Sequence, residues 1–191
     1  MEIEEILKSN PDSIVVVDEA YVDFGAESCV PLIHKYDNLL VTQTFSKSRS
    51  MAGARLGVGV GCASLIQDLN TIKYSTNPYN INRMTMAAGL GVLADEDYTR
   101  SNCQEIIKSR QYTEKELKRL GFTMTASSAN FVFAKHPEIS GKELYLKLKE
   151  NGVLIRHFDK DKIKDYNRIT IGTLDQMNQF ICETEKILEG N

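Results

Sequence analysis

The chain has 191 residues, of which 42% are hydrophobic and 26% are charged, and a chain of this length can bury about 70% of its unfolded surface. This composition is typical of a globular protein with one large domain or two small ones. The formal net charge is −3. Because the basic excess of a nucleic-acid-binding protein is missing, we expect no nucleic-acid partner.

The N-terminal sequence and the cysteines indicate the cellular compartment of the protein. MEIEEILKSNPDS is acidic and amphipathic, unlike a secretory signal peptide, and no apolar run approaches the roughly 20 residues that span a bilayer. The cysteines form no CxxC pair and have no histidine at zinc-ligand spacing. We therefore expect a cytoplasmic protein without membrane contact or bound metal, with reduced and buried thiols. The four thiols are those of Cys29, Cys62, Cys103 and Cys182.

In the first two-thirds of the chain, short apolar runs alternate with helical patterns, and this alternation predicts an α/β fold. Ile14–Val17 and Leu39–Thr42 are continuous runs suited to strands buried on both faces of a parallel sheet. Leu56–Val60 predicts a third strand, whose glycines we attribute to close packing because the GxGxxG spacing of a dinucleotide loop is missing. Helices are expected at Ala63–Lys73 and Asn82–Leu93.

A charged pattern with a narrow apolar stripe predicts a long helix over residues 95–120, ended by Gly121, and such a helix often links two domains. We expect a partial large domain at 1–94, this linking helix, and a small α+β domain at 121–191. In the small domain, the patterns predict strands at Phe122–Thr125, Phe131–Ala134, Gly152–Arg156 and Arg168–Ile171, a helix at Gly141–Glu150, and a closing helix over LDQMNQFICETEKIL.

Polar residues follow the first predicted strand. Asp18 comes directly after IVVV, and Tyr21 follows three residues later. Ligands collect at the carboxyl ends of parallel strands, and a carboxylate at an apolar strand end is costly to bury without a cation or hydrogen-bond donors. A turn acid and a core aromatic are equally good interpretations of these two residues.

The second predicted strand ends in a hydroxyl-rich loop, TQTFSKSRSMAGARLG. It has too many small and hydroxyl residues for a helix interior, so Lys47 is presented on a loop at the sheet edge. A lone lysine there is usually a surface charge. Hydroxyls and a planar cation, here Thr44, Ser46 and Arg55, are what a phosphate monoester requires. The loop is therefore a candidate phosphate site.

Five segments in order resemble fold-type I pyridoxal-phosphate-dependent aminotransferases, and most closely the histidinol-phosphate aminotransferase family: VVVDEAYVDF, TFSKSRSMAGARLG, NPYNIN, ANFVF and GVLIRHF…NRITIGT. The resemblance implies part of the mostly parallel large domain of that fold, followed by its small α+β domain. It also implies a homodimeric transferase of histidine biosynthesis with pyridoxal 5′-phosphate as cofactor. The implied reaction converts histidinol phosphate and 2-oxoglutarate into imidazole acetol phosphate and glutamate. A threonine-phosphate decarboxylase-like enzyme and a non-catalytic α/β module are the alternatives.

The resemblance assigns roles to the residues of both loops. Lys47 would be the catalytic lysine that bonds to the cofactor aldehyde and later moves the substrate proton, with burial favouring its neutral form. Asp18 would pair with the pyridinium nitrogen, and Tyr21 would donate to the phenolic oxygen. The phosphate would be held by Thr44, Ser46 and Arg55.

The resemblance also reaches the small domain. It makes Arg168 the partner of the substrate carboxylate, whereas the sequence alone favours an edge-strand arginine paired with an acid. Arg156 is a candidate second anion contact, and Asn130 lies near the substrate or stabilises a turn. The histidines, His34, His136 and His157, match no metal or triad spacing and are interpreted as surface or structural.

Members of the family carry an additional N-terminal half, which supplies a phosphate loop and an aromatic that stacks on the cofactor ring. We therefore expect little or no turnover from this chain alone, because catalysis depends on holding the ring in one geometry. We also expect the chain to self-associate through the apolar faces that the other half would cover.

Overall fold

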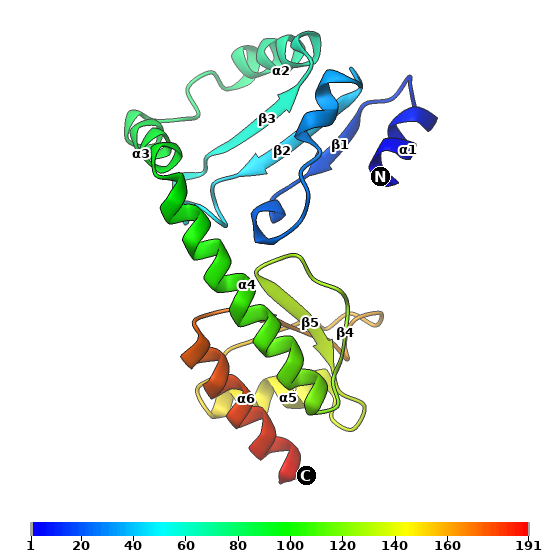
Figure 1. Cartoon of the computed structure of the whole chain (residues 1–191), viewed down its shortest axis with the longest axis vertical. Coiled ribbons are helices and arrows are strands. Elements are labelled where there is room, and N and C mark those ends of the chain that lie inside the picture. The colour runs from blue at the N-terminus through cyan, green and yellow to red at the C-terminus, as the bar shows by residue number, and fades with distance from the viewer. Residues whose placement is uncertain (1, 191) are drawn as a thin grey trace. The chain divides into compact units, whose positions relative to one another are not determined.

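The computed structural model describes residues 2–190 and divides into two compact units, Met1–Arg100 and Ser101–Asn191. The first unit combines a small sheet with helices at its sides (Figure 1). Its elements are α1 (Glu2–Ser9), β1 (Val15–Asp18), the 3₁₀ turns η1 (Val22–Phe24) and η2 (Val30–His34), β2 (Leu39–Thr44), η3 (Ala52–Ala54), β3 (Gly57–Gly61), α2 (Ala63–Thr76) and α3 (Arg83–Ala94).

The sheet of the first unit has the order β1-β2-β3. Strands β1 and β2 are parallel, with Asp18 opposite Thr42, as the sequence predicts. Strand β3 runs antiparallel to β2. The reason is the connection: a parallel return needs a long crossover, usually a helix, whereas residues 45–56 form a loop whose only helical part is η3.

Only one face of β1 is well covered. Leu7 of α1 is buried together with Leu39 and Val41 of β2. On the other face Val16 is 57% exposed, so the expectation that this strand is buried on both faces is wrong for the chain as it stands. Burial alternates along β1 because successive side chains point to opposite faces.

The glycines of β3 are explained by close packing. A Cβ atom on Gly57 would lie 3.0 Å from the carbonyl oxygen of Gln43, and one on Gly61 would lie 3.1 Å from that of Leu39. Gly89 of α3 is even more restricted, since a Cβ there would lie 2.6 Å from the Leu56 side chain. Helix α3 therefore packs directly on the base of the loop that carries Lys47.

Helix α4 (Glu96–Arg119) is the long helix that the charge pattern predicts, and Gly121 just beyond it has a φ of +87°, as a helix-terminating glycine does. The last turns of α4 belong to the core of the second unit through Leu117. The other elements of this unit are β4 (Thr123–Met124), β5 (Phe131–Lys135), α5 (Gly141–Glu150), β6 (Arg156–His157), β7 (Asn167–Thr170) and α6 (Leu174–Glu189).

The sheet of the second unit is antiparallel throughout, in the order β4-β5-β7-β6. Val132 and Ile169 point to one face and join a core with side chains of α4, α5 and α6. The strand predicted at Gly152–Arg156 is wrong for most of its length. Leu154 is 77% exposed, and pairing with β7 begins only at Arg156.

The cysteines are all free, but only two fit the expected burial. Cys29 and Cys103 are buried, Cys62 is half-buried and Cys182 is exposed. Burial raises the pKa of the Cys29 thiol, and the nearby carboxylates of Glu19 and Glu27 add to this effect. The expectation of four buried thiols is therefore wrong for Cys62 and Cys182.

Candidate functional site

The register of β1 and β2 brings the candidate residues of the first unit to one edge of the sheet. The two strands are parallel, so their carboxyl ends lie together, where open sheets bind ligands. Asp18 ends β1 and Thr44 ends β2. Asp18 is exposed, and its Oδ1 accepts a hydrogen bond of 3.0 Å from the backbone N–H of Ala20. Oδ1 thus stabilises the turn after β1, and the other carboxylate oxygen forms no hydrogen bond within residues 2–190.

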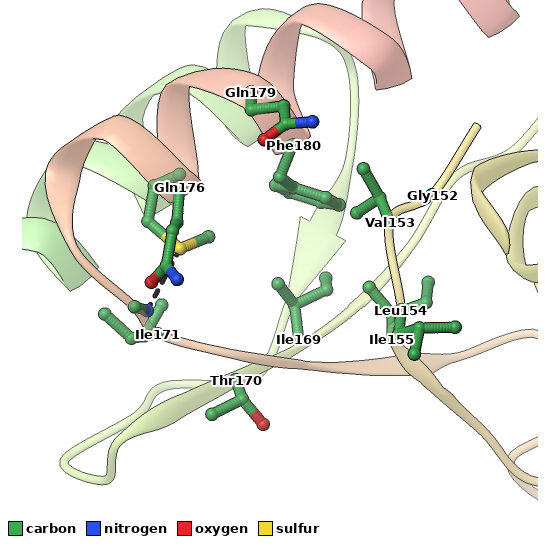
Figure 2. Close-up of a pocket in the computed structure, with 12 residues that line it drawn as sticks. Gly152, Val153, Leu154, Ile155, Ile169, Thr170, Ile171, Gln176, Gln179 and Phe180 are labelled. Atoms are coloured by element: carbon green, nitrogen blue, oxygen red, sulfur yellow. Dashed lines mark hydrogen bonds between the residues drawn. The ribbon is translucent and has the colours of Figure 1, made fainter.

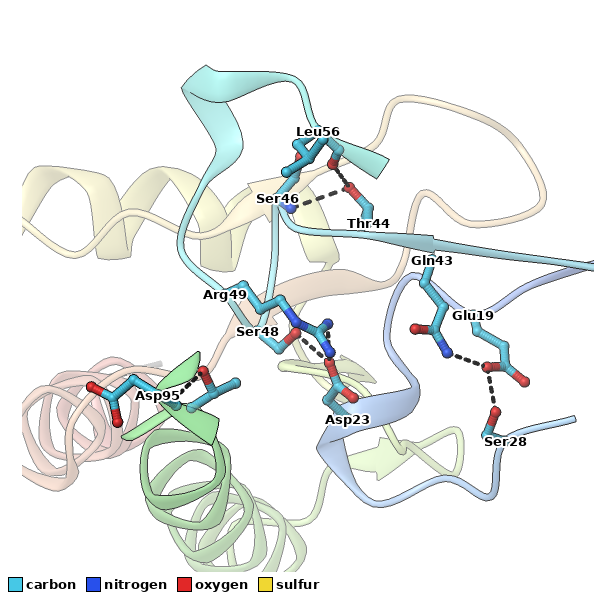
Figure 3. Close-up of polar contacts among 11 residues, drawn as sticks. Glu19, Asp23, Ser28, Gln43, Thr44, Ser46, Ser48, Arg49, Leu56 and Asp95 are labelled. Carbon is cyan, nitrogen blue, oxygen red and sulfur yellow. Dashed lines mark hydrogen bonds and ion pairs between the residues drawn. The ribbon is translucent and has the colours of Figure 1, made fainter. Parts of the chain in front are cut away.

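The loop that carries Lys47, residues 45–56, is closed at its base by the backbone. The N–H of Phe45 donates to the carbonyl of Leu56 over 3.0 Å, and the N–H of Met51 donates to the carbonyl of Phe45 over 2.9 Å. Thr44 Oγ1 accepts from the N–H of Ser46 over 3.1 Å (Figure 3). We call this segment the lysine loop.

The lysine and the tyrosine lie together. Lys47 Nζ is 5.4 Å from the centroid of the Tyr21 ring. The lysine is exposed, so the burial expected to favour its neutral form is not present in this chain. The structure therefore places an accessible amine beside a phenol, at the sheet edge where Asp18 lies.

Arg55 closes the lysine loop in an uncommon backbone conformation. Its φ is +54°, a left-handed value that costs energy in a residue other than glycine and is often kept at functional sites. Its side chain is exposed, and its Nη1 donates one hydrogen bond of 3.1 Å to the carbonyl of Ala52. The remaining donors of this guanidinium are available to an anion.

A second carboxylate, that of Glu19, lies next to Asp18 and is not among the residues predicted from the sequence. Glu19 is only 7% exposed. It accepts hydrogen bonds from Ser28 Oγ over 2.8 Å and from Gln43 Nε2 over 2.9 Å (Figure 3). The backbone N–H of Cys29 donates a third hydrogen bond to this carboxylate. A buried carboxylate needs such donors, so Glu19 is a structural acid that fixes the end of β1. The alternation along the strand could have indicated that Glu19 faces the core and Asp18 faces away from it.

In the second unit, Arg156 of β6 and Arg168 of β7 are directly opposite each other, and Phe133 of β5 follows in the same row. The guanidinium of Arg168 lies 5.3 Å from the Phe131 ring centroid, and that of Arg156 lies 5.5 Å from the Phe158 ring centroid. The Nε of Arg168 is buried without a hydrogen bond. Like charges opposite each other are destabilising, so this pair suits a bound anion.

The interpretation of Arg168 as an edge-strand arginine paired with an acid does not hold. Strand β7 lies inside its sheet, between β5 and β6. Within residues 2–190, Arg168 forms no ion pair.

Asn130 lies in a turn that other residues hold. Ser127 Oγ donates to the carbonyl of Phe131 over 2.6 Å, and Arg110 Nη1 donates to that of Ala129 over 2.6 Å. Asn130 itself accepts through its carbonyl from the N–H of Ile171, over 2.9 Å. These bonds do not involve the Asn130 side chain, which forms no hydrogen bond within residues 2–190.

A cavity of about 320 Å³ in the second unit lies between the segment before β6, strand β7 and the start of α6 (Figure 2). Val153, Ile155, Ile169 and Phe180 contribute apolar walls. None of the candidate site residues lines it, and its lining carries no charge. The cavity is therefore not the predicted anion site.

Two of the histidines have structural contacts. His136 Nε2 lies 3.0 Å from the carbonyl oxygen of Leu120, and His157 Nδ1 lies 3.2 Å from Asn167 Oδ1. His34 is exposed. Among residues 2–190, no group of three or more histidine, cysteine or acidic side chains could hold a metal ion, and no helix of that range is long and apolar enough to cross a membrane.

The family model for aminotransferase class I and II matches residues 1–183. The histidinol-phosphate aminotransferase of Brachyspira hyodysenteriae is 48% identical over 189 residues, which are 98% of this chain and 53% of the relative. The chain thus spans about half the length of the curated relatives that it matches.

Solved structures show the same architecture. The histidinol-phosphate aminotransferase from Clostridium acetobutylicum matches with a TM-score of 0.88 and 26% identity, over 99% of this chain and 59% of that one. The enzyme from Sinorhizobium meliloti, solved in complex with pyridoxal-5′-phosphate, matches with a TM-score of 0.82 and 23% identity, over 98% of this chain and 53% of that one. At this lower identity the second match shows the fold alone.

Proposed function

This chain belongs to the aminotransferase class I and II family, and we propose on that premise that it is the C-terminal portion of a histidinol-phosphate aminotransferase. Its fold class is the predicted one, part of the mostly parallel large domain of a fold-type I pyridoxal-phosphate enzyme followed by a small α+β domain. The observation that carries the proposal is the amine of Lys47, 5.4 Å from the Tyr21 ring centroid, at the sheet edge where Asp18 ends β1.

The residues at this edge fit pyridoxal 5′-phosphate. An accessible amine suits its aldehyde, a carboxylate oxygen without a hydrogen bond suits its ring nitrogen, and the free guanidinium donors of Arg55 suit its phosphate. Thr44 and Ser46 add hydroxyls. When bound, this cofactor supplies an electron-withdrawing ring that stabilises negative charge on the substrate carbon.

Each side chain at this edge would then have its own role toward the cofactor or the substrate. Lys47 would supply the nucleophilic amine and would afterwards take and return the proton at the substrate Cα, and both roles require a neutral amine. Asp18 would favour a proton on the cofactor's ring nitrogen by placing a negative charge beside it. Tyr21 would donate a hydrogen bond to the cofactor's phenolic oxygen. Arg55 would hold the phosphate end and so orient the ring.

Arg168 and Arg156 supply the anion-binding pair of the second unit. We assign the substrate carboxylate to Arg168, whose buried Nε has no hydrogen-bond partner, and a second anionic group to Arg156. Asn130 directly precedes Phe131, and the guanidinium of Arg168 lies over the Phe131 ring. Histidinol phosphate carries a phosphate, and 2-oxoglutarate carries two carboxylates, so both substrates of the proposed reaction have anions for such a pair.

The proposed enzyme is a cytoplasmic homodimer of histidine biosynthesis. It transfers the amino group of histidinol phosphate to 2-oxoglutarate and forms imidazole acetol phosphate and glutamate. The identity of 48% with a histidinol-phosphate aminotransferase over nearly the whole chain supports this reaction.

Complementation tests this function. The chain would be mixed with the separately produced N-terminal half of the Brachyspira hyodysenteriae relative and pyridoxal phosphate, and glutamate formation from histidinol phosphate and 2-oxoglutarate would be measured. We expect little turnover from either part alone and turnover from the mixture, abolished by Lys47→Ala. Release of carbon dioxide from threonine phosphate, without glutamate formation, would instead indicate the decarboxylase.

A further inference from the structure

One carboxylate ties the lysine loop to the turn that follows β1. Asp23 Oδ2 accepts a hydrogen bond from Ser48 Oγ and another, of 3.0 Å, from Arg49 Nη1 (Figure 3). Both donors come directly after Lys47 in the chain. Charge-assisted hydrogen bonds of this kind are among the stronger ones in proteins.

The donor side of this link is well ordered by packing. Ser48 is 8% exposed, and the Arg49 guanidinium lies 5.1 Å from the Phe45 ring centroid. On the other side of Lys47, the N–H of Ser46 is held by Thr44 Oγ1. The lysine is thus an exposed residue between two fixed neighbours.

The acceptor side is equally restrained. Asp23 lies in η1, next to Phe24, which is fully buried. The N–H of Phe24 donates to the carbonyl of Tyr21 over 3.1 Å, and the N–H of Val22 donates to the carbonyl of Glu19 over 3.2 Å. Because Asp23 and Tyr21 belong to the same short turn, whatever fixes Asp23 to the lysine loop also fixes Tyr21 relative to Lys47.

We propose that Asp23 is a positioning residue, whose bonds to Ser48 and Arg49 hold Lys47 in place beside Tyr21. The proposal rests on the proposed function and deepens it, since it names the group that sets the geometry of the reactive amine. Asp23 acts through the loop and not by contact with cofactor or substrate. A carboxylate that only stabilised the fold would not affect where the cofactor reacts.

The test compares variants on both sides of the link. Asp23→Ala removes the acceptor, and Asp23→Asn keeps the shape but loses the charge. The double variant Ser48→Ala/Arg49→Met breaks the same link from the loop side, which covers the case in which Asp23→Ala fails to fold. Asp68→Ala, an exposed acid of α2 in the same unit, is the matched control.

Two measurements separate positioning from stability. In the first, each protein is treated with a limiting amount of pyridoxal phosphate and reduced with borohydride, and mass spectrometry gives the share of label on Lys47 among all lysines. In the second, amide hydrogen exchange is followed in peptides covering residues 45–51 without cofactor. Thermal melting is recorded for every variant.

We expect the share of label on Lys47 to fall about ten- to a hundredfold in Asp23→Ala and in the double variant, because displacements near 1 Å have effects of that order. Asp23→Asn should lie between these variants and the wild type, and Asp68→Ala should match the wild type. Exchange should accelerate in residues 45–51 of the variants that lose the link. An unchanged share of label in folded variants would overturn the positioning role and leave the proposed function standing. A wild type without preferential label on Lys47 would overturn both.

Discussion

Arg156 and Arg168 lie directly opposite each other on the antiparallel strands β6 and β7, and within residues 2–190 neither guanidinium forms an ion pair. Each guanidinium lies instead near the ring of an aromatic residue, Phe158 for Arg156 and Phe131 for Arg168. Stacking of this kind holds a cation while its N–H groups remain available. The second unit therefore keeps two positive charges together, which favours an anionic ligand.

A first prediction concerns this pair. Arg156→Gln should raise the free energy of unfolding in anion-free buffer by about 0.2–1 kcal/mol, because it removes the repulsion between two like charges on neighbouring strands. The same change should weaken the stabilisation by added phosphate. Thermal melting with and without phosphate measures both effects, with Lys142→Gln, an exposed residue of α5, as control. Equal stabilisation of wild type and variant by phosphate would count against an anion site at this pair.

A second prediction is that any phosphate, sulfate or cofactor phosphate bound to the first unit contacts Arg55. Losing a charged hydrogen bond costs about 1.5–3 kcal/mol, so Arg55→Gln should raise the pyridoxal phosphate concentration for half-maximal trapping about ten- to a hundredfold. Arg55→Gly should weaken binding in the same way without loss of fold stability, since glycine adopts the φ of +54° found there without steric cost. Lys73→Gln on α2 is the control. Crystals with sulfate bound elsewhere and Arg55 turned away would refute the assignment.

A third prediction is that the chain self-associates. Met86, Leu90 and Leu93 lie on one stripe of α3, and all three are exposed. Exposed apolar surface of this kind favours association. Sedimentation should give a mass above that of a monomer, and the triple change of these residues to glutamine should shift it toward the monomer. A wild-type chain that stays monomeric at high concentration would show that these faces do not associate.

A fourth prediction follows from Glu4 of α1. Hydrogen bonds from Lys35 and Tyr36 lower the pKa of its carboxyl from 4.5 to about 2. A carboxyl with a lowered folded-state pKa contributes stability above its unfolded value, and this contribution is lost as the pH falls from about 4.5 toward 2. Glu4→Gln should therefore be less stable than wild type at neutral pH, with the difference shrinking across that range.

Urea unfolding at several pH values measures this difference. Glu5→Gln, an exposed change on the same helix, should leave the pH dependence unchanged. A constant difference between wild type and Glu4→Gln from neutral pH to pH 2 would contradict the role of this carboxylate.

Much of the fold follows from local pattern. Helix α5 has the predicted bounds, and Gly121 ends α4 through a conformation that glycine adopts without steric cost. The lysine loop was recognisable because its small and hydroxyl residues disfavour a helix. The antiparallel direction of β3 was missed because an apolar run carries no direction. The connection over residues 45–56 could have indicated the antiparallel direction, because it lacks the crossover helix that a parallel strand usually needs.

The finer arrangement of the site depends on tertiary contacts. Nothing in the order of residues links Asp23 to Arg49, because their pairing depends on how η1 and the lysine loop fold beside the sheet. The opposition of Arg156 and Arg168 depends on strand register, which changes with a shift of one residue. The exposure of Val16 also could not be read from its apolar run, because exposure depends on what covers the strand.

Lys47 is proposed to supply the amine of a pyridoxal phosphate site. The most direct measurement adds the cofactor to the chain, reduces the product with borohydride, and maps the labelled lysine by mass spectrometry, with Lys47→Arg as control. We predict label concentrated on Lys47 and lost in the variant, with little or no turnover of histidinol phosphate by the chain alone. Label scattered over exposed lysines such as Lys8 and Lys73, and unchanged in Lys47→Arg, would contradict the assignment.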